Sequence, residues 1–131
     1  IVFWILIVIE ILLGTGIRTN LELVSIENPL LSKGELLNTL DSYKYFHSVL
    51  GFSLLFLSIY IYLKLRYNKL YIAQFLGAFT LGMIIVQIFL GEMMIFFELP
   101  QLTRLFHTWG SSWLVGVIII LYNCISNEYA Q

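Results

Sequence analysis

The chain has 131 residues, of which 60% are hydrophobic and 11% are charged, and its mean hydropathy is +0.89. A soluble domain is about half apolar and about a quarter charged, so this composition predicts an integral membrane protein. The net charge of -1 offers no basic surface to nucleic acid. The single cysteine, Cys124, excludes an internal disulfide and a cysteine-built metal cluster.

Four apolar runs predict an all-α, integral membrane four-helix bundle that forms one domain over residues 1–131. The runs cover residues 1–16, 43–63, 70–97 and 102–124. The last three reach the ~20 residues that cross ~30 Å of hydrocarbon, whereas the first is near the lower limit and is expected to be incomplete. Lipid offers no hydrogen-bonding partner to the backbone, which favours helices.

The loops predict the orientation of the bundle. The connection between the second and third runs contains Lys64, Arg66 and Lys69 and no acid, which is typical of a cytoplasmic loop. The loops at 17–44 and 92–104 should then face outward, with both termini cytoplasmic in a bacterial inner membrane. Leucines at helical spacing between residues 29 and 40 also predict a short interfacial helix.

An internal repeat relates the two halves of the chain. Residues 10–14 (EILLG) resemble residues 87–91 (QIFLG), and residues 46–48 (FHS) resemble residues 106–108 (FHT). In each case an outward-going helix ends near a glycine and an inward-going helix begins near Phe-His. This pattern predicts a two-plus-two helix repeat about an axis along the membrane normal. The equivalent polar residues Glu10 and Gln87 are expected to pack the halves together, with a proton path through Glu10 as the alternative.

The chain contains two histidines, and both fall near the start of an inward-going helix. His47 precedes Lys64 by 17 residues, or roughly 26 Å of helix, and His107 follows Pro100 by seven. The two imidazoles should therefore lie at similar depth near the outer face and meet across the repeat axis. Zinc usually takes four ligands, whereas a haem iron takes two axial ones. The pattern predicts a b-type haem whose iron is bound by His47 and His107.

Further residues are predicted to contact this haem. Small residues one turn after each histidine would let a porphyrin approach the backbone, and cations at the outer boundary would pair with its propionates. The small residues are Ser48, Gly51, Gly110 and Ser111, and the cations are Arg18, Lys44 and Arg104. The alternative is that the histidines are interfacial hydrogen-bonding groups and that the glycines serve close helix packing.

The same residues resemble a known family. Residues 87–91, Leu99-Pro100 and His107 are similar to the Q-x-x-L-G, x-x-L-P, H pattern in the last helix pair of haem A synthase. Residues 13–18 and 46–48 resemble the preceding helix pair, so the resemblance covers nearly the whole chain. It implies half of an eight-helix oxidoreductase that converts haem O to haem A for cytochrome oxidase. The chain looks like the carboxy-terminal half, which holds a b-type haem.

The resemblance also implies partners: a second four-helix half or a homo-oligomer, with haem O synthase or cytochrome oxidase nearby in the bilayer. No outer-loop cysteine is present, and no catalytic residue can be named. A haem with both axial positions filled suits electron transfer or structural support, which leaves open whether this half is itself catalytic. The alternatives are a stand-alone membrane cytochrome b and a cofactor-free structural subunit of a respiratory complex.

Overall fold

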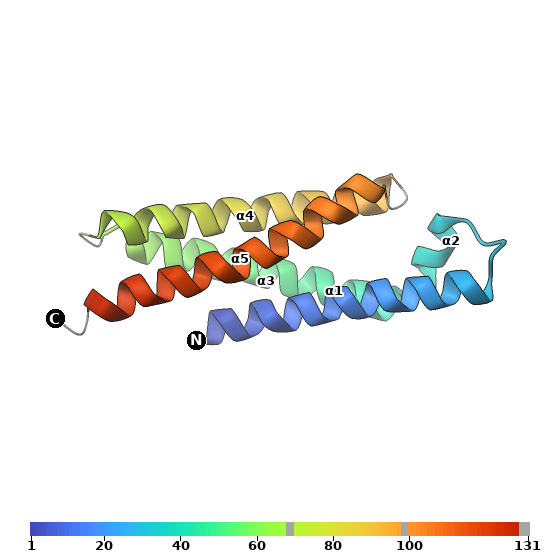
Figure 1. Cartoon of the computed structure of the whole chain (residues 1–131), viewed down its shortest axis with the longest axis horizontal. Coiled ribbons are helices and arrows are strands. Elements are labelled where there is room, and N and C mark those ends of the chain that lie inside the picture. Colours follow the sequence, from blue (N-terminus) through green and yellow to red (C-terminus); the bar gives the residue numbers. More distant parts are fainter. Residues whose placement is uncertain (68–69, 98–99, 129–131) are drawn as a thin grey trace.

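The computed structural model describes residues 1–67, 70–97 and 100–128, and every regular element in them is a helix (Figure 1). Lys69 of the predicted cytoplasmic loop and Leu99 of the family pattern lie outside the described residues. The helices are α1 (Val2–Glu27), α2 (Lys33–Asn38), α3 (Asp41–Leu65), α4 (Tyr71–Phe96) and α5 (Gln101–Glu128).

Four of these helices, α1, α3, α4 and α5, are long and apolar enough to cross a membrane. The prediction of an all-α chain with four helices able to span a membrane is therefore confirmed. The helices α3, α4 and α5 correspond to the second, third and fourth apolar runs and begin within two residues of the predicted positions. Helix α5 continues to Glu128, four residues beyond the predicted end at Cys124. The pattern of apolar runs is therefore a good guide to these three helices.

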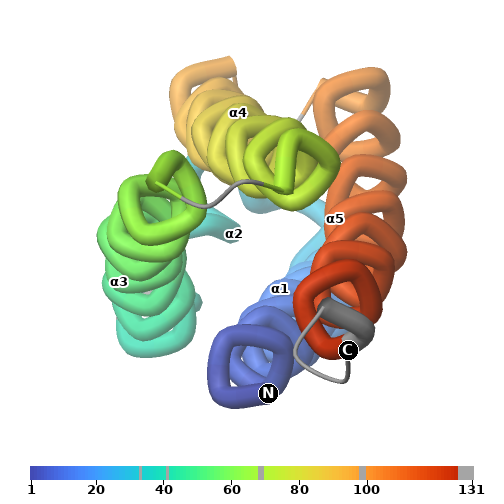
Figure 2. The backbone as a smooth tube through the Cα atoms, turned by 90° about the vertical axis from the view of Figure 1, so that its left-hand side faces the viewer, coloured from blue at the N-terminus to red at the C-terminus, as the bar shows by residue number. Residues whose placement is uncertain are grey.

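The four long helices form a ring in the order α1, α3, α4, α5 (Figure 2). Contacts are most extensive between α4 and α5 and between α3 and α4, and are sparser between α1 and α5. One end of the bundle holds α2, the last turn of α4 and the first turn of α5, and we call it the α2 end. The start of α1, the end of α3, the start of α4 and the end of α5 lie at the opposite end (Figure 1).

The core of the bundle receives side chains from every long helix. Its buried residues are Ile7, Leu54, Ile84, Leu114 and Ile118, with a second cluster formed by Leu65, Ala73 and Leu121. Many other large apolar side chains are exposed, among them Phe56, Phe89 and Trp113 at 69%, 63% and 69%. A soluble protein rarely exposes such large apolar surfaces, so these side chains are suited to contact with lipid.

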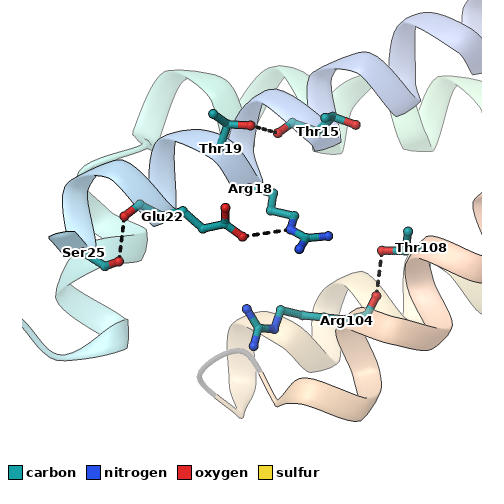
Figure 3. A network of polar contacts seen from close by, with 7 residues as sticks. All are labelled: Thr15, Arg18, Thr19, Glu22, Ser25, Arg104 and Thr108. Carbon is teal, nitrogen blue, oxygen red and sulfur yellow. Dashed lines mark hydrogen bonds and ion pairs between the residues drawn. The ribbon is translucent and has the colours of Figure 1, made fainter.

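Helix α1 is longer than the first apolar run, and the prediction that a loop begins at residue 17 is wrong. The helix continues to Glu27 because its polar residues support it locally. Arg18 forms an ion pair with Glu22 one turn away, at 3.0 Å, and the hydroxyl of Thr19 donates to the Thr15 carbonyl (Figure 3). No proline interrupts the helix before residue 29.

The short helix predicted between residues 29 and 40 is present as α2, but it spans only Lys33–Asn38. Its start is fixed by a capping box: the Ser32 hydroxyl accepts from the Glu35 backbone N–H, and the Glu35 carboxylate accepts from the Ser32 backbone N–H at 2.8 Å. Leu36 of α2 and Leu40, the residue before α3, are buried, and α2 contacts α1.

The capping box makes α2 sensitive to pH. Hydrogen bonds from the side chain and backbone of Ser32 hold the pKa of the Glu35 carboxyl below its ordinary value. Their stabilisation of α2 is complete above that ordinary value and is lost as the pH falls through the lower folded-state pKa. Hydrogen–deuterium exchange, corrected for intrinsic rates, should show α2 amides losing protection on acidification while α4 amides keep theirs. Glu35→Gln should remove this dependence, and its persistence in that variant would contradict the assignment.

Candidate functional site

The two histidines occupy matching positions near the α2 end. His47 lies six residues after Asp41, the first residue of α3, and His107 lies six residues after Gln101, the first residue of α5. Each is therefore about 9 Å along its helix at ~1.5 Å per residue. Their ring centroids are 6.4 Å apart and their ring planes differ by 73°. The structure thus brings together the two imidazoles that the sequence predicts to meet.

A glycine from a neighbouring helix lies against each imidazole. A Cβ atom added to Gly14 of α1 would lie 3.3 Å from Cε1 of His47, and one added to Gly91 of α4 would lie 3.8 Å from Cε1 of His107. Sequence analysis did not assign these glycines to the site, although both belong to the repeated Leu-Gly pair. Their lack of a side chain lets each ring lie close to the backbone of the neighbouring helix.

The glycines predicted to line a porphyrin have other neighbours. A Cβ at Gly51 would lie 3.1 Å from Oε1 of Glu10, and a Cβ at Gly110 would clash with Nε2 of Gln87. These contacts give both glycines a packing role, because each makes space for a polar side chain from the adjacent helix. Ser111 donates to Oε1 of Gln87 at 3.3 Å and to the His107 carbonyl at 2.9 Å.

The polar contacts of Glu10 and Gln87 lie within their own helix pairs, Glu10 with His47 of α3 and Gln87 with Ser111 of α5, so these contacts do not join the two halves as predicted. Oε1 of Glu10 is 3.0 Å from Nδ1 of His47. The distance suits an ion pair, but the alignment does not complete a hydrogen bond to Nδ1. Among the described residues, the buried side-chain polar atoms without a hydrogen bond are Glu10 Oε2, His47 Nδ1, Gln87 Nε2 and His107 Nδ1. Buried polar groups usually have partners, so this cluster is unusual for a purely structural core.

Two of the predicted propionate partners lie at the α2 end, on α1 and α5 (Figure 3). Arg18 is one turn beyond Gly14, where it pairs with Glu22 and is well exposed. Arg104 is nearly one turn before His107 and is also exposed. A third cation, Lys44, donates to the Leu37 carbonyl at 3.5 Å. Measured along the helix axis, the backbone of Arg18 is therefore about 6 Å from Gly14, and that of Arg104 is within about 6 Å of His107.

The close fit at Gly110 gives a testable expectation. Gly110→Ala should destabilise the bundle, because the new methyl group must displace the buried amide of Gln87. Overpacking of this kind costs about 1–3 kcal/mol. Gly116→Ala is the matched control on the same helix, since nothing lies within 4 Å of its added Cβ. Thermal unfolding in detergent should give a lower midpoint for Gly110→Ala only, and equal midpoints would contradict the packing described.

The spacing of the two imidazoles would allow both to bind one metal ion. In the part of the chain that the structure describes, no three His, Cys, Asp or Glu side chains gather at one point. Two metal–nitrogen bonds of about 2.0 Å on opposite sides of a metal would place imidazole centroids about 6 Å apart, close to the observed 6.4 Å. Comparison of the chain with protein-family models, curated proteins and solved structures found no match.

Proposed function

We propose that the chain binds one b-type haem between His47 and His107, as part of a haem A synthase-like membrane oxidoreductase that supports oxidation of haem O to haem A. The observation that carries the proposal is the approach of the two rings to 6.4 Å from α3 and α5. Gly14 and Gly91 support it further, because their lack of a side chain lets each ring lie close to the backbone of the neighbouring helix.

In this proposal the Nε2 atoms of His47 and His107 face the iron, and their Nδ1 atoms are left to supporting groups. A neutral imidazole nitrogen is a common metal ligand in proteins. A bound haem would supply one-electron chemistry at a centre with both axial positions filled. Gly51, Gly110 and Ser111 contribute by seating Glu10 and Gln87 beside the histidines.

The propionates would point toward the α2 end, where Arg18 and Arg104 offer charge-assisted hydrogen bonds. Arg18 would then exchange or share its present partner, Glu22. We place the α2 end on the outer side of a bacterial inner membrane, because Lys64 and Arg66 lie at the opposite end. Both termini are then cytoplasmic.

A spectrum tests the proposal directly. The purified full chain, expressed with haem supply or reconstituted with haem b, should show the Soret and split α-band absorption of a bis-imidazole haem at one haem per chain. Colourless protein that folds normally and takes up no haem would overturn the proposal. That result would favour the cofactor-free structural subunit, in which Glu10 and His47 form only an ion pair.

The second candidate is a stand-alone membrane cytochrome b that carries electrons. It is favoured by one feature of the site: if both His47 and His107 hold the iron, no open position would remain for oxygen. Supplying haem O and a reductant to the haem-loaded chain, with air present, separates the two functions. Formation of haem A supports the synthase, with or without a second half or a second copy of the chain, whereas redox cycling without haem A supports the carrier.

A further inference from the structure

Glu10 is an acid within a membrane-spanning helix, and its nearest polar neighbour is a histidine. Its side chain is 16% exposed, and that of His47 is 25% exposed. A carboxylate at membrane depth is costly and usually has a specific partner. Arg18, a cation on the same helix, lies two turns away and is paired with Glu22. The contact of 3.0 Å with His47 therefore explains why an acid is tolerated at this position.

The other histidine has a neutral neighbour at the corresponding place. Gln87 precedes Gly91 by four residues, just as Glu10 precedes Gly14 by four, and each glycine lies against the histidine of its own helix pair. The Gln87 side chain is engaged by Ser111, at 3.3 Å. No carboxylate approaches His107 among the ion pairs of the described residues. Each imidazole thus lies against a glycine, but His47 has a carboxylate beside it, whereas His107 has the backbone of Gln87 as its polar neighbour.

Resting on the proposed function, we propose that Glu10 is a positioning residue that accepts the Nδ1–H of His47 while Nε2 of that ring binds the iron. His107 lacks this support, so the two axial ligands are unequal in donor strength. The present contact needs only a small ring rotation to align, and the second torsion of a histidine side chain is broad. A carboxylate behind a ligating imidazole fixes its tautomer and raises its basicity. A more basic ligand favours ferric over ferrous iron.

The test is the midpoint potential of the haem-loaded full chain at one fixed pH, together with its absorption spectrum. Glu10→Gln should keep the bis-imidazole spectrum but shift the equilibrium toward ferrous haem by at least about tenfold, which is 59 mV for one electron. Glu27→Gln is the control, because it removes the same charge from α1 at a residue 13 positions beyond Gly14 that forms no ion pair with a histidine or Arg18 among the described residues. An unchanged potential in Glu10→Gln, or an equal shift in Glu27→Gln, would overturn the proposal.

Glu10→Asp separates a hydrogen bond from a plain charge effect, and it also serves if Glu10→Gln fails to accumulate. It keeps the negative charge but withdraws the carboxylate by one methylene group. A potential that rises in Glu10→Asp supports the positioning role, and a potential equal to that of the parent chain overturns it. Failure of the proposed function looks different: the parent chain itself would then show no bis-imidazole spectrum, and both proposals would fall together.

Discussion

Replacing either histidine with alanine should abolish the low-spin haem spectrum, and replacing both should abolish haem binding. Loss of a group that merely supports a ligand costs about 10–100-fold in metal affinity, so loss of the ligand itself should cost more. The remaining imidazole would hold a five-coordinate haem with a shifted Soret band. Haem content per chain and the absorption spectrum of His47→Ala, His107→Ala and the double variant measure these effects.

Controls for these variants come from neighbouring hydroxyl residues on the same helices. Thr108 donates to the carbonyl of Arg104, and Ser53 donates to that of Val49, so each bonds only to its own helix. Thr108→Ala and Ser53→Ala should retain the full haem content. A double histidine variant that still binds haem at the parent level would contradict the assignment of both ligands.

Gly14→Val should reduce haem affinity by roughly ten- to a hundredfold, whereas Gly16→Val should leave it near that of the parent chain. A Cβ at Gly14 already lies 3.3 Å from Cε1 of His47, so the added methyl groups of valine must push the ring aside. Overpacking costs about 1–3 kcal/mol, and each 1.4 kcal/mol corresponds to about tenfold in affinity. Gly16 is a matched control two residues away, since nothing lies within 4 Å of its added Cβ.

Haem titration of detergent-solubilised protein measures both affinities, and the unfolding midpoint shows whether each variant still folds. Equal affinities for Gly14→Val and Gly16→Val would show that the His47 ring can move without consequence. That outcome would remove Gly14 from the site and leave the histidine ligands untouched.

The helices were predictable because a membrane demands long apolar runs, and proline and charge mark their ends. The end of α1 was not, since the polar residues from Thr15 onward continue the helix through local bonds that no hydropathy pattern reveals. The pairing of His47 with His107 followed from helix direction and depth, which are properties of the chain as a whole. The number, approximate bounds and direction of the helices are therefore predictable from the sequence.

The neighbours of the histidines were harder to predict, because they depend on how each helix is rotated about its axis. In a soluble bundle an apolar stripe marks the inner face of a helix. In this chain the outer faces of the helices are as apolar as the inner ones, so no apolar stripe distinguishes the inner face. Gly51 was predicted to contact a porphyrin, but its closeness to Glu10 was not predicted, and Gly14 was overlooked. Glu10 itself was the better guide to the inner face, because an acid avoids lipid.

Few contacts join α1 to α5, so the ring of helices is weakly closed there, and this should affect the lifetime of the protein in the cell. The histidines lie on α3 and α5, which are not neighbours in the ring of helices (Figure 2). A haem bound by both histidines would link α3 to α5 across the bundle. A ligand present at a free concentration of a hundred times its dissociation constant adds about 2.7 kcal/mol to the free energy of unfolding. The steady-state amount of this protein would then follow porphyrin supply, with unfilled copies the first to be cleared by membrane proteases.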